Sequence, residues 1–473
     1  MKIKKFYINT IGCQMNVYDS EQIAERLRRI GFVMETRVEK ADLVIVNTCS
    51  IREKAEQKAF SFLGRLAKMK REKPHLMVGV CGCVAQQEGQ KIIERMPHVD
   101  FVLGTQAIER LPAAIEKIEK QGCRIVDVDM TREIQETAGM PTPGKAHEVS
   151  RFVSIMRGCD NYCTYCVVPY VRGRETSREP EDIVNEIKSL VASGVREITL
   201  LGQNVNSYGQ KQDLCDFPTL LRRINEVEGL FRLRFTTSHP KDLSDGLVDA
   251  FQSMEKLCHH IHLPVQSGSN DVLARMNRRY TREKYLDMVE KLRASCPEIA
   301  ITSDIIVGFP GETREDFELT KALIRQVGFD GLFAFIYSDR PNAPSGRFKG
   351  KLAEKEKKQR LQEVFDLQAG ITQKIHAHMK GTIQEVLVEG TSKKQAGDSR
   401  NRAPDAVQWT GRTGGNKIVN FFQNSVSRVD TGIKEGEMVR VRIERAFPHS
   451  LWGSVVTCDS GHSLVKGEES YAA

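Results

Sequence analysis

The sequence predicts an α/β protein with two consecutive parallel-sheet regions, followed by a small β domain. Its 473 residues are enough for about three domains of ordinary size. Strand-like apolar runs alternate with helical patterns through the first 340 residues, and such strand–helix series form parallel sheets. Towards the C-terminal end the pattern changes to short strands without helices between them.

The composition predicts a globular protein outside the membrane. Hydrophobic residues make up 40% of the chain, yet no run approaches the roughly 18 apolar residues that span a bilayer. The N-terminal segment MKIKKFYINTIG lacks the apolar stretch of a signal peptide, so we expect a cytoplasmic location. Twelve cysteines are too few for a disulfide scaffold, and in a reducing compartment clustered cysteines bind metal or do chemistry. The net charge of +8 fits either a solvated surface or, given the basic runs 171–178 and 275–284, a polyanion partner.

Three segments of the N-terminal third share one pattern: an apolar strand, then a cysteine, then a helix. Cys13 and Cys49 each follow a strand, the second of which spans Leu43–Val46, and Cys81 and Cys83 follow a third. Loops after parallel strands gather at one edge of the sheet, where ligands bind, so one cysteine from each segment is predicted to converge there. We favour Cys83 over Cys81 because Cys83 stands at the strand-to-helix turn. The alternative is that each cysteine is a small buried hydrophobe.

The central region, beginning near residue 150, contains six further strand–helix units. They fit an open barrel as well as a doubly wound sheet, and in both cases functional groups belong at the C-terminal strand ends. Those ends are polar and include Gln203, Gln266 and Asp304, beside His239, which can equally mark the end of a strand. We therefore expect them to line a pocket. The predicted strands are Phe152–Met156, Glu197–Leu201, Arg232–Thr236, His259–Leu263, Ile301–Val307 and Leu332–Tyr337, and the clearest helices are 179–194, 217–229 and 313–328.

The loop after the first of these strands carries Cys159, Cys163 and Cys166 in the spacing C-x3-C-x2-C. A structural zinc site closes with four protein ligands, and an iron–sulfur cube usually takes four cysteine thiolates. Three ligands leave one iron open to a small molecule. With the aromatic Tyr165 just before the last cysteine, the motif resembles that of the radical S-adenosylmethionine (SAM) enzymes. The alternative is a zinc site completed by a distant residue.

Long stretches of the first two regions resemble the radical SAM methylthiotransferases. The matching segments are GCQMNVYDSE (12–21), NTCSIREKAEQK (47–58), GCVAQ (82–86), RGCDNYCTYCVVPYVRGRETSR (157–178), LLGQNVNSYG (200–209), HLPVQSGS (262–269) and DIIVGFPGET (304–313). Matches of this length are far more specific than a lone cysteine motif.

The resemblance implies a flavodoxin-like N-terminal domain (1–122) whose auxiliary [4Fe-4S] cluster is held by Cys13, Cys49 and Cys83. It also implies a radical SAM core (145–377), an open (β/α)6 partial barrel, whose [4Fe-4S] cluster is held by Cys159, Cys163 and Cys166. SAM then binds the open iron of the second cluster. Cys81 has no counterpart in the usual family pattern.

The C-terminal region is predicted to be a long charged helix (352–380) followed by a small β-barrel. Short strands with basic and aromatic residues suit a nucleic-acid-binding barrel, although a generic small β domain is the alternative. The stretch GRTGGNKIVNF (411–421) matches the TRAM pattern, so the resemblance implies an RNA-binding TRAM domain (378–460). We expect Arg412 and Lys417 to contact RNA, and residues 392–409 resemble a flexible insertion.

The resemblance implies a tRNA-modifying enzyme that adds a methylthio group to C2 of N6-isopentenyl-adenosine at position 37, with SAM as methyl donor and radical source. The stretches GCQMN and SIREKAEQK favour this branch over relatives that modify threonylcarbamoyl-adenosine in tRNA or a ribosomal protein. A zinc-bearing RNA adaptor without catalysis is the alternative of another class.

Individual contacts and partners are further expectations, and no single catalytic side chain follows from the sequence. We expect a reducing donor such as flavodoxin or ferredoxin, no membrane association, and a monomer. We expect SAM contacts from Tyr165, Gln203, Gln266 and Asp304. The residues expected to contact tRNA phosphate, or to order the cysteine loop, are Arg172, Arg174 and Arg178.

Overall fold

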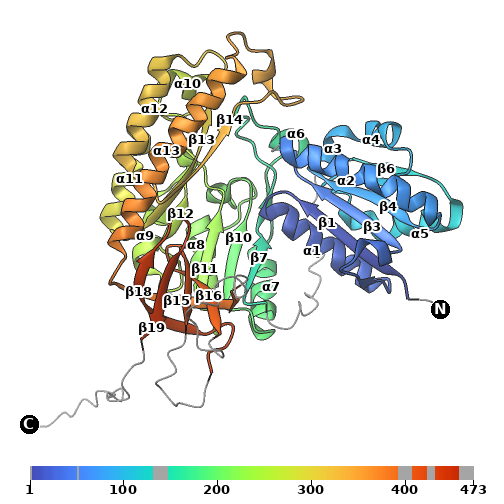
Figure 1. Cartoon of the computed structure of the whole chain (residues 1–473), viewed down its shortest axis with the longest axis horizontal. Helices are drawn as coiled ribbons and strands as arrows, with labels where there is room; N and C mark the ends of the chain where they lie inside the picture. Colours follow the sequence, from blue (N-terminus) through green and yellow to red (C-terminus); the bar gives the residue numbers. More distant parts are fainter. Residues whose placement is uncertain (1–2, 51–52, 131–147, 393–406, 423–431, 457–473) are drawn as a thin grey trace, which may run out of the picture. The chain divides into compact units, whose positions relative to one another are not determined.

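The computed structural model describes residues 3–50, 53–130, 148–392, 407–422 and 432–456. The chain divides into two compact units, Met1–Gln368 and Ala369–Ala473. The first unit contains both parallel-sheet regions, and the second contains a β-barrel (Figure 1).

The N-terminal region forms a six-stranded parallel sheet in the order β2-β1-β3-β4-β5-β6. The strand β3 is buried along its whole length, as is usual for parallel strands covered on both faces. The order 2-1-3-4-5 is that of flavodoxin-like sheets, so the predicted fold is confirmed. The last strand continues the sheet beyond residue 122. The strands are β1 (Lys5–Ile11), β2 (Val33–Met34), β3 (Leu43–Thr48), β4 (Met77–Gly82), β5 (Phe101–Leu103) and β6 (Ile125–Asp127).

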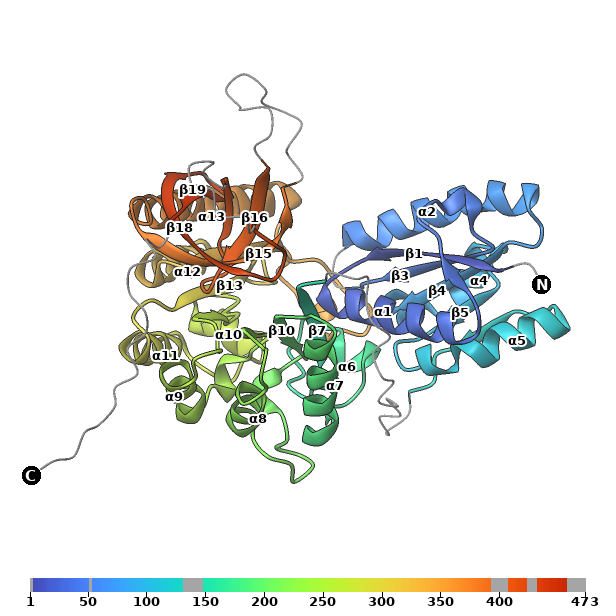
Figure 2. The same ribbon diagram turned by 90° about the horizontal axis from the view of Figure 1, so that it is seen from below.

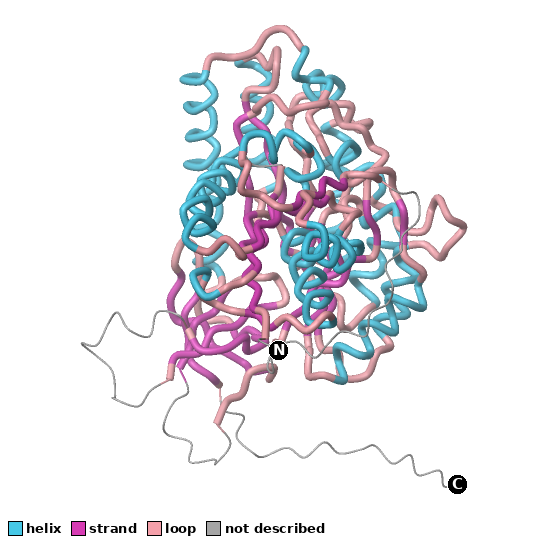
Figure 3. Tube along the Cα trace, turned by 90° about the vertical axis from the view of Figure 1, so that its right-hand side faces the viewer, coloured by secondary structure: helices cyan, strands magenta, loops and turns pink. Residues whose placement is uncertain are grey.

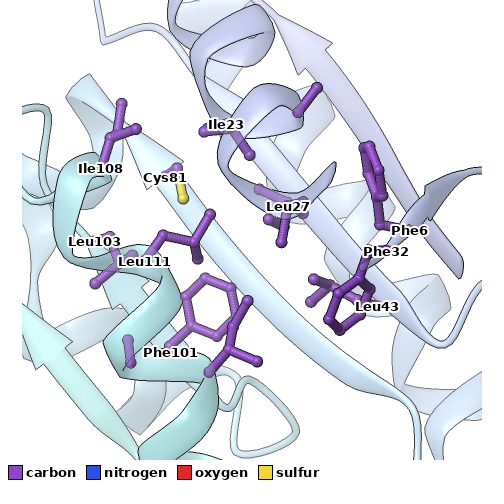
Figure 4. Packing of buried hydrophobic residues seen from close by; sticks show 14 of the residues in the cluster. Phe6, Ile23, Leu27, Phe32, Leu43, Cys81, Phe101, Leu103, Ile108 and Leu111 are labelled. Carbon is purple, nitrogen blue, oxygen red and sulfur yellow. The ribbon is translucent and has the colours of Figure 1, made fainter. Parts of the chain in front are cut away.

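Helices cover both faces of this sheet, and Figure 2 shows α2 on one side and α1 and α5 on the other. Leu27 of α1 and Leu111 of α5 pack with Phe6 and Phe101 of the strands, as Figure 4 shows. The opposite face packs against Leu63 of α2 and against α3 and α4. The helices are α1 (Gln14–Arg29), α2 (Glu53–Glu72), α3 (Cys83–Glu88), α4 (Gln90–Arg95) and α5 (Leu111–Gln121).

The central region of the first unit is a series of six parallel strands in chain order. They form two three-stranded sheets, β11-β10-β7 and β12-β13-β14, which the bond from Cys258 N to Leu233 O (2.9 Å) joins. Within the described residues the end strands β7 and β14 do not pair, so the barrel is open. The strands are β7 (Ser150–Ser154), β10 (Glu197–Leu201), β11 (Arg232–Thr236), β12 (His260–His262), β13 (Ala300–Val307) and β14 (Gly331–Ile336).

Helices follow most of these strands, as the sequence predicts for strand–helix units. A short antiparallel pair, β8 (Met156–Arg157) with β9 (Thr176–Ser177), lies on either side of the loop that carries Cys159, Cys163 and Cys166. The helices are α6 (Val168–Val171), α7 (Pro180–Ala192), α8 (Phe217–Asn225), α9 (Asp245–Ser253), α10 (Asn270–Arg275), α11 (Arg282–Ser295) and α12 (Arg314–Val327).

In the second unit five strands close into a barrel in the order β15-β16-β17-β19-β18. In Figure 3 they form the group of magenta strands at lower left. The interior is apolar and includes Val388, Phe421 and Leu451. The helix α13 (Glu354–His378) precedes it, and the strands are β15 (Ile383–Thr391), β16 (Gln408–Thr413), β17 (Ile418–Phe422), β18 (Met438–Ala446) and β19 (Leu451–Val455).

The predicted elements agree closely with the structure, with one exception. The predicted strand 152–156 is wrong in its second half, because β7 ends at Ser154 and Met156 pairs with β9 instead. The insertion expected at 392–409 lies outside the described residues over 393–406, and its last two residues begin β16. Across the described part of the chain we find no helix with the length and apolarity that crossing a bilayer requires.

Gly79 of β4 lies directly opposite Phe101 of β5, and no side chain fits there. A Cβ at Gly79 would lie 2.0 Å from Cζ of this fully buried ring. We expect Gly79→Ala to lower the free energy of unfolding by about 1–3 kcal/mol, as overpacking does. Phe101→Leu in the same chain should recover part of the loss, as measured by urea unfolding followed by far-UV circular dichroism.

The matched control is Gly64→Ala in α2, where nothing lies within 4 Å of the Cβ position. Alanine has the higher helix propensity, so stability should stay equal or rise. Equal losses at Gly64 and Gly79 would contradict the packing explanation.

Candidate functional site

Cys13, Cys49 and Cys83 lie at the carboxyl ends of three adjacent strands, where the parallel-sheet pattern predicts them. Cys13 directly precedes α1, Cys49 follows β3, and Cys83 begins α3 after β4. A hydrogen bond from Cys49 and the charge of Arg172 lower the pKa of Cys13 to about 6, although burial opposes the shift. Burial raises the pKa of Cys83, and Arg172 opposes that rise. We call these three cysteines the first trio.

Two buried amides fix the loops that carry the first trio. The Asn16 side chain accepts from Cys13 N at 3.2 Å and donates to Thr48 O at 3.2 Å. Asn47 donates to the Asn16 backbone oxygen at 2.8 Å. Gly82 has a φ of +91°, and a Cβ there would lie 2.3 Å from Asn47 Oδ1, so only glycine fits. Sequence reasoning missed this role of the asparagines because it depends on how β1 packs beside β3.

Cys81 lies on the face of the sheet that α1 and α5 cover, whereas Val78 and Val80 of β4 face the other side, because successive strand residues alternate between the two faces. Its sulfur is fully buried in the apolar cluster of Figure 4, near Leu103 and Leu111, and burial raises its pKa far above the ordinary value. Cys83 instead packs against Val167 and Val171, at the helix that follows the second cysteine loop. The geometry supports the preference for Cys83, and its role as a ligand stays a prediction.

The second trio, Cys159, Cys163 and Cys166, lies on the loop between β8 and α6. Cys159 and Cys163 are buried, and Cys166 is half-buried. Val168 N donates to the Cys166 sulfur at 3.5 Å. Burial raises the pKa of Cys159 to about 11 and that of Cys166 to about 12. Both are therefore neutral thiols without metal and would release protons on binding it.

Two nitrogen donors are aimed at the Cys163 sulfur. Arg278 Nη1 lies 3.5 Å from it, and His239 Nε2 lies 4.0 Å from it. His239 Nδ1 accepts from Lys241 N at 3.3 Å, and burial lowers the pKa of the ring, so the neutral ring carries its proton on Nε2. Hydrogen bonds to cluster sulfurs are a known means of tuning iron–sulfur centres. In the sequence, Arg278 is only one member of the basic run 275–284, and no neighbouring residue pattern indicates that it is buried.

The four residues predicted to contact SAM lie close to the second trio or at strand ends. Both polar atoms of the Gln203 amide are buried, and neither has a partner within the described residues. Gln266 is buried with a φ of +74°. Its backbone N donates to Asp304 O of β13, and its backbone O accepts from Ile306 N of the same strand. Asp304 Oδ1 lies 3.5 Å from His262 Nε2 of β12, and the Tyr165 hydroxyl lies 3.4 Å from Arg278 Nη1. A buried amide without a partner fits a polar ligand, and the individual SAM contacts stay predictions.

Arg172 links the two trios. Its Nη2 donates to Asp19 Oδ2 at 2.6 Å, both side chains are buried, and it also hydrogen-bonds Cys83. Beside it, Thr105 donates to Val171 O at 2.7 Å. The segment that follows the second trio is therefore anchored on the sheet edge that carries the first.

The three arginines expected to contact tRNA or to order the loop differ in burial. Arg172 and Arg178 are buried, and Arg178 bonds Ser154 O at 2.7 Å and Glu186 at 2.8 Å. Their burial and pairing argue against a phosphate contact and agree with the ordering role. Arg174 is exposed beside Asp160, so its contact with RNA stays a prediction.

The two barrel residues expected to contact RNA lie close together. Arg412 is on β16, where it bonds Glu389 at 2.9 Å and Asn416 at 3.2 Å. Lys417 follows in the turn before β17, and its backbone N donates to Thr413 Oγ1 at 3.1 Å. Both side chains are half-buried, and their contact with RNA stays a prediction.

The donor sets fit iron–sulfur clusters. Thiolate ligands suit zinc and iron–sulfur clusters, and the nitrogen donors on the second trio suit the latter. Within the described residues, no three His, Cys, Asp or Glu side chains gather as tightly as the ligands of one metal ion. A four-iron cube binds each thiolate at a different corner, so its ligands stand further apart than those of a single ion.

Three family models match the chain. Residues 5–104 match the family described as "Uncharacterized protein family UPF0004", residues 153–324 match the radical SAM superfamily, and residues 377–456 match the TRAM domain. Among solved structures, the radical S-adenosylmethionine methyltransferase TsrM from Kitasatospora setae has a TM-score of 0.53 at 14% identity, covering 73% of this chain and 75% of that one. That likeness concerns the fold alone.

Similar proteins carry the name tRNA-2-methylthio-N(6)-dimethylallyladenosine synthase. The protein from Desulfosudis oleivorans is 54% identical over 96% of this chain and 97% of its own. Those from Geobacter metallireducens (49%; 96% and 98%) and Syntrophus aciditrophicus (48%; 97% and 96%) are similar over comparable lengths.

The different positions of Cys81 and Cys83 predict different iron contents. After anaerobic reconstitution with iron and sulfide, we expect about eight irons per chain for two cubes in the parent protein. Cys83→Ala should retain about four, because one trio is broken, and Cys81→Ala should retain all of them. Cys123→Ala, after α5, is the control that changes a cysteine of neither trio. Iron loss in the Cys81 variant alone would reverse the assignment, and tightly bound zinc without brown colour would favour the adaptor.

Proposed function

The chain belongs to the radical SAM methylthiotransferases, the family of the tRNA-2-methylthio-N(6)-dimethylallyladenosine synthases, and on this premise we propose that it adds a methylthio group to C2 of N6-isopentenyl-adenosine at position 37 of tRNA. It is a tRNA-modifying enzyme that uses SAM and [4Fe-4S] clusters. The likeness to its relatives extends over both cysteine trios and the TRAM region.

The observation that carries the proposal is the set of contacts between the segment after the second trio and the sheet edge that carries the first trio. The helix α6 begins just after Cys166 and packs on Cys83, while Arg172 at its end reaches Asp19 of α1. A transfer from one cofactor to a carbon activated by another requires both to lie within reach of one substrate atom. Contacts of this kind between the two cysteine sites support such an arrangement.

When bound, SAM and the two clusters supply the methylthio group and the radical chemistry at C2. We propose that the protein's own residues bind, orient and exclude water. The first cluster would be held by Cys13, Cys49 and Cys83, with the Arg172 charge favouring the thiolate forms of Cys13 and Cys83. Cys159, Cys163 and Cys166 would hold the second cluster, and the burial of Cys159 and Cys163 keeps water from their sulfurs.

The substrate tRNA needs a cationic surface. We propose that Arg174, Arg412 and Lys417 contact its backbone, since positive side chains on exposed loops and small barrels bind phosphate. A low-potential donor such as flavodoxin or ferredoxin, a monomeric state and a cytoplasmic location belong to the same proposal.

Nucleoside mass spectrometry tests the substrate assignment. A bacterial strain that lacks its own enzyme should accumulate isopentenyl-adenosine, and expression of this chain should convert it to the 2-methylthio form. The Cys159→Ala variant is the matched control and should leave the nucleoside unmodified. Unmodified isopentenyl-adenosine together with methylthiolated threonylcarbamoyl-adenosine would move the assignment to the neighbouring branch.

The proposed phosphate contacts predict a change in salt dependence. Arg174→Gln, Arg412→Gln and Lys417→Gln should each weaken tRNA binding and lower the slope of log K against log salt by about 0.7–0.9 per lost contact. Filter binding between low and moderate salt measures this slope. Arg178→Lys, at a buried arginine, is the control and should leave the slope unchanged. Parent-like affinity and slope in all three variants would contradict the proposed RNA contacts.

A further inference from the structure

Arg278 is a buried arginine built into the second trio. Its side chain is 4% exposed, and its guanidinium donates to Pro264 O at 2.6 Å, the Tyr280 hydroxyl at 2.8 Å and the Cys163 sulfur at 3.5 Å. Each of its nitrogens therefore has an acceptor, and one acceptor is a candidate cluster ligand. These contacts fix the guanidinium plane beside the cysteine loop.

The turn around Arg278 is held in an unusual conformation. Asn277 and Arg279, on either side, have φ values of +59° and +58°, which side chains other than glycine rarely adopt. Asn277 donates to Tyr162 O at 3.1 Å, so this turn is tied to the cysteine loop. Strain of this kind persists where the surrounding structure enforces it, often at functional sites.

Within the described part of the chain, the charge of Arg278 has no carboxylate partner. Among the residues that the structure describes, its neighbours are two tyrosine hydroxyls, the Pro264 backbone oxygen and Cys163. By contrast, the buried Arg172 pairs with Asp19, Arg234 with Glu197 and Arg360 with Glu312. A buried charge without a counterion is strongly unfavourable, so the position of Arg278 indicates an anion at the second trio.

We propose that Arg278 is a positioning residue that supplies the counter-charge of the second cluster and raises its reduction potential. The inference rests on the proposed function, because it requires a [4Fe-4S] cluster on Cys159, Cys163 and Cys166. An oxidised cube with three thiolates carries one negative charge, and taking up one electron from a chemical reductant gives two. A fixed positive charge in contact stabilises the second state more than the first, which favours reduction.

The test is an EPR-monitored redox titration with dithionite on the full-length chain. Replacing Cys13, Cys49 and Cys83 by alanine leaves one cluster, whose midpoint potential and iron content are then measured. Adding Arg278→Met should shift the reduction equilibrium at least tenfold toward the oxidised cluster, about 59 mV to more negative potential for one electron. Arg278→Lys keeps the charge and should stay closer to the parent potential than Arg278→Met does.

The matched control is the reciprocal background, in which Cys159, Cys163 and Cys166 are replaced and only the first cluster remains. There Arg278→Met should leave the potential unchanged. A fully loaded Arg278→Met protein with the parent potential in the first background overturns the inference. A parent background that binds no cluster contradicts the proposed function itself, so the two failures are distinguishable.

Loss of iron is also decisive. If Arg278→Met loads poorly, Arg278→Gln, which keeps nitrogen donors without the charge, takes its place, and a parent-like potential there overturns the inference. Iron loss in both neutral variants with full loading in Arg278→Lys supports it, because the anion then needs the charge. Equal iron loss in Arg278→Lys overturns it, since shape rather than charge would be the requirement.

Discussion

The buried ion pair between Asp19 and Arg172 is the interaction on which the candidate site depends. Asp19 belongs to α1 of the N-terminal sheet, and Arg172 follows the loop of the second trio, so the pair joins residues 153 positions apart. Burying both charges is unfavourable unless they meet in good geometry, and breaking such a pair costs about 3–5 kcal/mol. Together with the bond from Thr105 to Val171 O, the pair therefore fixes α6 on the sheet edge that carries the first trio.

The two trios have different electrostatic settings. The charge of Arg172 is paired with the carboxylate of Asp19, so it has a counterion before any cluster binds. The charge of Arg278 is not shared with a carboxylate in the described residues, so the second trio sits in a positive environment. Arginine thus has two roles in this protein: Arg172 joins two parts of the fold, and Arg278 contacts Cys163 of the second trio.

Much of the fold and of the site follows from local pattern. Alternating strands and helices predict parallel sheets, and the rule that loops gather at strand ends predicts that Cys13, Cys49 and Cys83 converge. What the sequence does not reveal is pairing across long separations. Arg172 and Arg178 look like phosphate contacts because they stand in a basic run, but their partners Asp19 and Glu186 become neighbours only in the folded chain. Arg278 is hidden in the same way, because burial depends on Tyr280 and on the turn around it.

The position of Cys81 has a consequence for how many protein ligands the first trio can have. A further sulfur in the same segment as Cys83 would be an obvious fourth ligand. The alternation of side chains along β4 instead places Cys81 on the face that α1 and α5 cover, inside the apolar packing there. Moving the Cys81 sulfur out of this packing would require β4 to give up bonds to β3 and β5. The packing around Cys81 thus disfavours this thiol as a fourth ligand, which would leave one corner of a cluster on the first trio accessible to an incoming small molecule.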